Sequence, residues 1–178
     1  MKRLSNASQH KLRRLFWFLL VVNLLFIVGS RYYLQPLTSK EIVAFELARE
    51  VPVAQELINN WQTTELLEKA RWSIYIDFVF IILYTIGLAV AGMFIARLTQ
   101  HEILIRSSKF LSYLLIIAGV CDVIENVSLL KSLNGEVTNW NVVLAYDMAT
   151  TKFSILILAI LFIAVCLVFW FFRKVSAR

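Results

Sequence analysis

The sequence has few of the residues from which most metal and redox sites are built. Its 178 residues include only two cysteines, Cys121 and Cys166, and two histidines, His10 and His101. Both cysteines fall inside long apolar runs, so they cannot form a disulfide framework. The histidines lie outside these runs, and no CxxC or HExxH spacing occurs. The sequence therefore carries no signature of a zinc, haem or flavin site.

Glycine and proline are also scarce, with five and two residues, whereas apolar residues make up 60% of the chain. A soluble domain is typically about half apolar. The excess lies in four runs, at about residues 15–33, 74–96, 110–130 and 152–172. Each approaches the ~20 residues that an α-helix needs to cross ~30 Å of hydrocarbon. The sequence predicts an all-α integral membrane four-helix bundle, with residues 1–178 forming one membrane domain.

The first run also has features of a signal peptide, because Arg13 and Arg14 precede a short apolar core. Residues 28–30, however, make a poor cleavage site without the usual alanines. We therefore interpret this run as a retained span.

Basic residues are distributed unequally between the two ends of the predicted spans. The net charge is +6, and eleven of the eighteen basic residues fall on one side, with Glu102 as the only acid beside them. Short cytoplasmic segments of membrane proteins carry such an excess of Lys and Arg. These residues are Lys2, Arg3, Lys11, Arg13, Arg14, Arg97, Arg106, Lys109, Arg173, Lys174 and Arg178. The pattern predicts a multi-pass protein with both termini in the cytoplasm and membrane lipid as its partner. It predicts no nucleic acid partner, and a homo-oligomer stays open.

The segment between the first two spans, about residues 38–72, lacks the Gly, Ser and Pro bias of a disordered connector. Its apolar residues keep helical spacing. We therefore favour short amphipathic helices that pack as an extracytoplasmic lid. The alternative is a solvated connector.

Local signals place the boundaries of these short helices. Thr38 and Glu41 have the spacing of a capping box. Pro52 is predicted to end the first helix and to open the second. Thr63 or Thr64 is predicted to cap a third, which is able to continue into the second span.

The third span contains three polar residues, Asp122, Glu125 and Asn126. With 3.6 residues per turn they share one helix face. Because the spans alternate in direction, Asp77 of the second and Lys152 of the fourth fall at a similar depth in the outer half of the membrane. Ionisable groups within spans usually face a bundle interior or an aqueous cavity. We therefore predict one polar site formed by these five residues.

Two further residues are candidates for the same site. Tyr84 lies on the Asp77 side of the second span and can donate a hydrogen bond, although a packed aromatic residue is the commoner explanation. Glu46 belongs to the lid and is a candidate to cover the site. Asp77 is equally compatible with a role at the helix start, where the macrodipole favours an acid. An alternative for Lys152 is a side chain that snorkels outward.

The charges of Asp77, Asp122 and Glu125 exceed the single charge of Lys152. A dry site cannot hold such an excess. Three solutions remain open, namely protonated carboxyls, a wet cavity, or a hard cation such as Ca²⁺ or Mg²⁺ bound by these three acids.

Several segments together resemble a family of small bacterial four-span integral membrane proteins that has no known activity. They are "IVAFELA" (residues 42–48), "IDFVFIILY" (76–84), "CDVIENVSLL" (121–130) and "TKF" (151–153). The resemblance implies a bacterial inner-membrane location. It also implies that Glu46, Asp77, Asp122, Glu125, Asn126 and Lys152 belong to one set, without indicating what that set does.

Three functions are compatible with these patterns. The one we favour is a pocket that binds, and that could chemically process, a lipid or amphiphile at the carboxylates and Lys152. The second is a structural or partner-binding membrane subunit whose polar layer sets helix register. The third is proton- or cation-coupled transport, which the apolar inner half of the spans disfavours. Whether the protein is an enzyme stays open.

Overall fold

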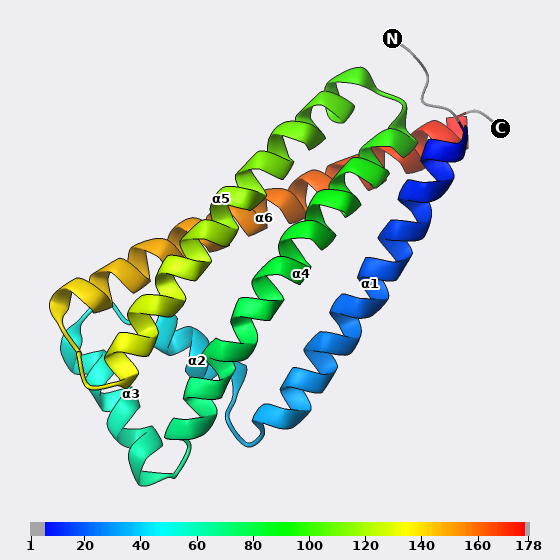
Figure 1. Cartoon of the computed structure of the whole chain (residues 1–178). Coiled ribbons are helices and arrows are strands. Elements are labelled where there is room, and N and C mark those ends of the chain that lie inside the picture. Colours follow the sequence, from blue (N-terminus) through cyan, green and yellow to red (C-terminus); the bar gives the residue numbers. More distant parts are fainter. Residues whose placement is uncertain (1–5, 177–178) are drawn as a thin grey trace.

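The computed structural model describes residues 6–176, and this part of the chain is helical with no β-strand. Its elements are α1 (Asn6–Leu34), α2 (Ser39–Glu46), α3 (Val51–Thr63), α4 (Leu67–Thr99), α5 (Glu102–Leu133) and α6 (Asn139–Ser176). The helices α1, α4, α5 and α6 are long and apolar enough to cross a membrane. The prediction of an all-α bundle is confirmed (Figure 1). Lys2, Arg3 and Arg178, which contributed to the predicted orientation, lie outside the described residues.

The bundle has a core of three mutually packed helices, α4, α5 and α6. Helix α1 packs along α4, and Figure 1 shows it flanking the core, with its N-terminal end near the C-terminal end of α6. The short helices α2 and α3 lie at the opposite end of the bundle (Figure 1). As a result, α1 and α6 do not pack against each other along their length, and a space is left between them.

Small residues allow α4 and α5 to approach closely. A Cβ atom added at Gly119 would lie 3.1 Å from the Thr85 hydroxyl oxygen and 3.4 Å from a methyl carbon of Ile81. Between α1 and α4, close approach is accompanied by a polar contact from Asn23. Its Nδ2 atom donates to the carbonyl oxygen of Leu83 at 3.2 Å, and Gly87 leaves room for it. Small-residue contacts of this kind favour helix association in lipid.

The cap that starts α2 is confirmed. Thr38 accepts a hydrogen bond from the backbone N–H of Glu41, whose carboxylate accepts one from the backbone N–H of Thr38 at 2.8 Å. The Thr38 hydroxyl also donates to the Glu41 carboxylate at 2.6 Å. This bond, followed by the one from the Thr38 backbone N–H, holds the pKa of Glu41 below its usual value. Pro52 lies in the first turn of α3 as predicted. Helix α2 already ends at Glu46, six residues earlier, so the proline is not what ends it.

The predicted cap of a third short helix is wrong. The hydroxyls of Thr63 and Thr64 both donate to the carbonyl oxygen of Asn60, at 2.9 and 2.7 Å, and so complete the end of α3. Helix α4 begins at Leu67, with Leu66 as an N-cap that makes no side-chain bond. Threonine side chains readily bond to the preceding turn in this way. The third predicted helix is therefore the beginning of α4.

An apolar cluster joins α2 and α3 to the end of the three-helix core. Trp61 of α3 is fully buried and contacts Phe45 of α2 edge-to-face, with 5.2 Å between ring centroids. The cluster consists of Leu37, Phe45, Ala48, Ala54, Ile58, Trp61, Ala70, Ile74, Leu129, Leu133, Val142 and Ala145. Burial of these side chains packs one face of the segment against the bundle, so the packed arrangement, not a solvated connector, is the one observed.

Candidate functional site

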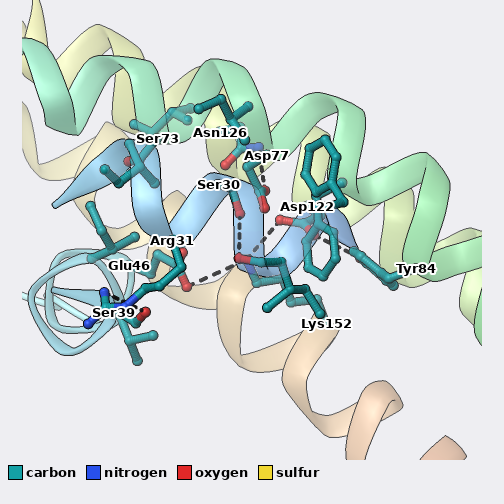
Figure 2. Close-up of a pocket in the computed structure, with 18 of the residues that line it drawn as sticks. Ser30, Arg31, Ser39, Glu46, Ser73, Asp77, Tyr84, Asp122, Asn126 and Lys152 are labelled. Atoms are coloured by element: carbon teal, nitrogen blue, oxygen red, sulfur yellow. Dashed lines mark hydrogen bonds and ion pairs between the residues drawn. The ribbon is translucent and has the colours of Figure 1, made fainter. Parts of the chain in front are cut away.

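The seven polar residues singled out in the sequence come together in the structure. Helix α4 supplies Asp77 and Tyr84, α5 supplies Asp122, Glu125 and Asn126, α6 supplies Lys152, and the last residue of α2 is Glu46. Figure 2 shows that the labelled members of this set converge from different helices on one pocket. We call these seven residues the ionic cluster.

Lys152 lies at the centre of the ionic cluster. Its Nζ atom is 2.8 Å from Oδ1 of Asp122, 2.9 Å from each carboxylate oxygen of Glu125, and 3.5 Å from Oε2 of Glu46. The ammonium also lies 5.0 Å from the ring centroid of Phe153. An ammonium has three N–H donors, and three carboxylates surround this one. Lys152 therefore joins α5, α6 and the end of α2 instead of snorkelling outward.

Two hydrogen bonds tie α4 to α5 in the same layer. The Tyr84 hydroxyl donates to Oδ2 of Asp122 at 2.7 Å, and Nδ2 of Asn126 donates to Oδ2 of Asp77 at 2.8 Å (Figure 2). Asp122 thus has a partner for each of its oxygens. Asp77 has the neutral amide of Asn126 as its hydrogen-bond donor, and in the described residues no cation lies within ion-pair distance of it.

The ionic cluster is deeply buried. Asp122 is 2% exposed, Glu125 0%, Asn126 2% and Lys152 5%. It contains four carboxyl groups and a single ammonium. Transfer of an uncompensated carboxylate into a low-dielectric interior costs several kcal/mol. The cluster therefore requires additional positive charge, as protons or as a bound cation, to be stable when dry.

Glu46 is the one acid of the cluster that lies outside the four long helices. Burial raises the pKa of its carboxyl from 4.5 to about 7, although the attraction of Lys152 opposes this effect. Repulsion from Asp77 and Asp122 raises the pKa further. The Glu46 carboxyl therefore gains or loses its proton close to neutral pH.

A cavity of about 490 Å³ opens beside the ionic cluster. Asp77, Tyr84, Asp122 and Asn126 form part of its wall together with Lys152. The apolar part of the wall comes mainly from α1, α4 and α6, with a smaller contribution from α2 and the residue Leu37 before it. It comprises Phe26, Ile27, Leu34, Leu37, Ile42, Val43, Ile74, Ile76, Phe80, Leu88, Phe153, Leu156 and Ile160. Because both α1 and α6 contribute, the cavity lies in the space that these two helices leave between them. Its volume is in the range of pockets for small organic ligands.

The cavity is also lined by polar groups near the end of α1 and the start of α2. Ser30, Arg31, Thr38 and Ser39 line it, and the Arg31 guanidinium donates to the Leu37 carbonyl oxygen and the Ser39 hydroxyl, both at 3.3 Å. These residues were not predicted from the sequence as part of a site. Arg31 had a signal, namely a charge directly after an apolar run, but nothing in the sequence placed it at the same cavity as Asp77.

Glu125 differs from the other members of the cluster because it does not line the cavity. It lies behind Lys152 and is fully buried. Its Oε1 has hydrogen-bond geometry to Nζ, while Oε2 has no hydrogen-bond donor among the described residues. Glu125 thus holds the lysine in place, whereas Asp77 and Asp122 face the cavity.

The residues described by the structure contain no group of three or more His, Cys, Asp or Glu side chains arranged to hold a metal ion. Lys152 lies between Asp122 and Glu125, at the point where a cation shared by these two acids would bind. A hard cation at Asp77, Asp122 and Glu125 therefore stays a prediction.

Comparison with known proteins adds no further constraint. No family model matches the chain, and no match to a curated protein or to a solved structure reaches significance. The resemblance to a bacterial four-span family stays a prediction.

Proposed function

We propose that this chain is a membrane protein that binds an amphiphile in the cavity beside the ionic cluster. The observation that carries the proposal is the composition of the cavity wall. One part is acidic, at Asp77 and Asp122, and the remainder is a long apolar surface between α1 and α6. A ligand with a polar group and a hydrocarbon tail matches both parts.

The surface of the long helices supports the membrane assignment. Large apolar side chains are exposed along their whole length, for example Leu25 and Val28 on α1, Ile82 on α4 and Phe172 on α6. Soluble monomers rarely expose contiguous apolar patches of this size. Together with the basic residues near the termini, this favours a membrane protein with both termini in the cytoplasm, and the resemblance to a bacterial four-span family implies the bacterial inner membrane. In that orientation, α2 and α3 lie outside and cover the ionic cluster as a lid.

The space between α1 and α6 provides a route for the ligand. Phe26 and Ile27 on one side and Leu156 and Ile160 on the other line the cavity. In a bilayer, this gap would face acyl chains, so an amphiphile can enter sideways with its tail in hydrocarbon throughout. The opposite half of the bundle is closed by packed residues such as Leu115, Ala159 and Cys166. Binding from the membrane therefore fits better than transport across it.

A structural role is the second candidate, and one observation favours it. Lys152 is already engaged by three carboxylates and joins three helices. Buried ionic groups can fix register and partner choice instead of function. Such a role accounts for the lysine but leaves the cavity unexplained.

Two neighbouring positions on α1 allow a matched test. Ser30 lines the cavity, whereas a side chain added at Gly29 would meet no atom within 4 Å. Ser30→Trp should fill the cavity, and Gly29→Trp should place the same side chain outside it. The protein is purified in a non-ionic detergent, and co-purified lipid is measured by native mass spectrometry.

We expect the wild type and Gly29→Trp to retain an amphiphile that Ser30→Trp has lost, with all three equally stable in detergent. Equal retention by all three would show that the cavity is not the binding site. Well-folded protein without bound amphiphile in any form would favour the structural role.

A further inference from the structure

The polar end of the ligand can be assigned from the charges around the cavity. Lys152 has its ammonium surrounded by Asp122, Glu125 and Glu46, with contacts of 2.8–3.5 Å. It is therefore unavailable to neutralise an anionic headgroup at the floor of the cavity. The acids that line the cavity there, Asp77, Asp122 and Glu46, are acceptors with negative charge. The floor of the cavity is thus electrostatically unsuited to a phosphate or a carboxylate.

Asp77 is the acid that still lacks a counter-ion. Its Oδ2 accepts from Asn126 at 2.8 Å, and its carboxylate lines the cavity. None of the ion pairs found in residues 6–176 involves it. A carboxylate facing a cavity with low-dielectric walls binds a cationic donor with a strong, charge-assisted hydrogen bond.

Aromatic rings surround the space in front of Asp77. Phe80 and Tyr84 follow it on the same face of α4, with their ring centroids 5.4 Å apart, and Phe26 of α1 stacks on Phe80 at 5.8 Å. Phe26, Phe80, Tyr84 and Phe153 all line the cavity. Ring faces attract cations, and the attraction is stronger where water is excluded. Carboxylate and rings together select an ammonium group.

We propose that the cavity takes an amphiphile whose polar group is a protonated primary amine, and that Asp77 binds this amine. This inference rests on the proposed amphiphile-binding function. The alkyl chain lies between α1 and α6, and the amine supplies the positive charge that four carboxyl groups and one lysine lack. The amine can belong to a lipid of the bilayer, such as one with a phosphoethanolamine headgroup, or to a free alkylamine.

Arg31 distinguishes these two sources. It lines the same cavity, and its guanidinium already donates to the Leu37 carbonyl oxygen and the Ser39 hydroxyl. A guanidinium has five N–H donors, so it retains donors for a phosphate. A zwitterionic lipid would use Asp77 and Arg31 together, whereas an alkylamine would use Asp77 alone.

The test compares ligands with the same alkyl chain and different polar groups. Dodecylamine, dodecanol and dodecyl phosphate are titrated against the delipidated full-length protein at neutral pH, with native mass spectrometry as the measure of binding. Single-chain phosphoethanolamine and phosphoglycerol lipids form a second series, and Ca²⁺ and Mg²⁺ without amphiphile a third. The variants are Asp77→Asn, which keeps an oxygen for Asn126, Asp77→Glu, which keeps the charge, and the exposed Asp147→Asn as control.

We expect dodecylamine to bind at least about tenfold more tightly than dodecanol, as one charge-assisted hydrogen bond implies. Asp77→Asn should abolish this preference, whereas Asp77→Glu and Asp147→Asn should keep it. A phosphoethanolamine lipid that binds more tightly than dodecylamine, and loses this advantage in Arg31→Gln, would identify the bilayer as the source. If the phosphoethanolamine lipid binds wild type and Arg31→Gln with equal affinity, the free alkylamine is identified as the source of the amine.

Other outcomes overturn the inference. If dodecanol or dodecyl phosphate binds as well as the amine and Ser30→Trp still blocks them, the cavity binds amphiphiles but does not select amines. If the divalent ions bind at Asp77 and exclude the amine, the cation is a metal ion. If Ser30→Trp affects none of the probes, both the inference and the proposed function fail.

Discussion

Nζ of Lys152 and Oδ1 of Asp122 lie 2.8 Å apart, and they connect α6 to α5 in a region where both side chains are almost completely buried. Asp122 is held on its other side by the Tyr84 hydroxyl of α4. The three core helices thus meet at one pair of charges. Packing of the helices and electrostatics of the cluster therefore depend on each other.

Loss of the lysine should be costly for stability. Lys152→Met leaves carboxylates buried without their cation, and removal of one partner from a buried ion pair typically costs about 3–5 kcal/mol. We expect a loss of that order in the free energy of unfolding, measured by SDS titration in mixed micelles. The exposed Lys109 provides the control variant Lys109→Met. The double variant Lys152→Met/Asp122→Asn should recover part of the loss, and wild-type stability in Lys152→Met alone would contradict the central role of the lysine.

Glu46 should make stability depend on pH. Because its pKa is about 7 in the folded protein and 4.5 as a free side chain, the folded state holds the proton more tightly. Its contribution to stability is therefore fully present below pH 4.5 and declines as the pH rises towards 7, by up to about 3 kcal/mol. Compared with Glu46→Gln, the wild type should lose thermal stability across this window. The control is Glu56→Gln, which removes an exposed carboxylate of α3; parallel profiles for wild type and Glu46→Gln would contradict the assignment.

Trp61 should hold α2 and α3 on the bundle. It is fully buried against Phe45, whereas Trp72, a few residues later, is 51% exposed. Trp61→Ala should cost about 3–5 kcal/mol because it leaves a large void. Limited proteolysis should then cleave the segment between α1 and α4 faster, while Trp72→Ala should be cleaved at the wild-type rate. Equal protection of both variants would indicate that the α2 and α3 segment is held by other contacts.

The contact between α4 and α5 should be sensitive to side-chain size at Gly119. A Cβ there lies 3.1 Å from Thr85, so Gly119→Val must push the helices apart, at a cost of about 1–3 kcal/mol. The same change at Gly29, which faces open space, should be nearly neutral. Thermal unfolding in detergent compares the two, and an unchanged Gly119→Val would mean that the helices can separate freely.

The orientation in the membrane can be measured directly. A reporter that is active only in the cytoplasm should be active when it is fused to the C-terminus. A reporter that is active only outside the cytoplasm should be active when it is inserted between α3 and α4. The expected cause is the surplus of Lys and Arg near the termini. Reversal of the two activities would place the ionic cluster on the cytoplasmic side and would refute the predicted topology.

Much of the architecture could be predicted because it depends on local patterns. The lengths of the four apolar runs required long helices, and the capping box at Thr38 set the start of α2. The spacing of Asp122, Glu125 and Asn126 put all three on one face of α5, since that follows from helix geometry alone. Where a residue had two local options, prediction failed, as for Thr63 and Thr64, whose hydroxyls complete α3 instead of opening α4.

The contacts between helices could not be predicted from local patterns. Hydrophobicity and charge along the chain determined that the protein is helical, which segments are long and apolar, and that five polar residues of the spans fall near one level. Only the tertiary structure decided that Lys152 contacts three acids, whereas Asp77 has no cationic partner among the described residues. It also decided that α1 packs on α4 and leaves a cavity towards α6. The physical reason is that contacts between helices depend on rotation about each axis and on crossing geometry. Both are set by the packing of many side chains at once, which no local spacing encodes.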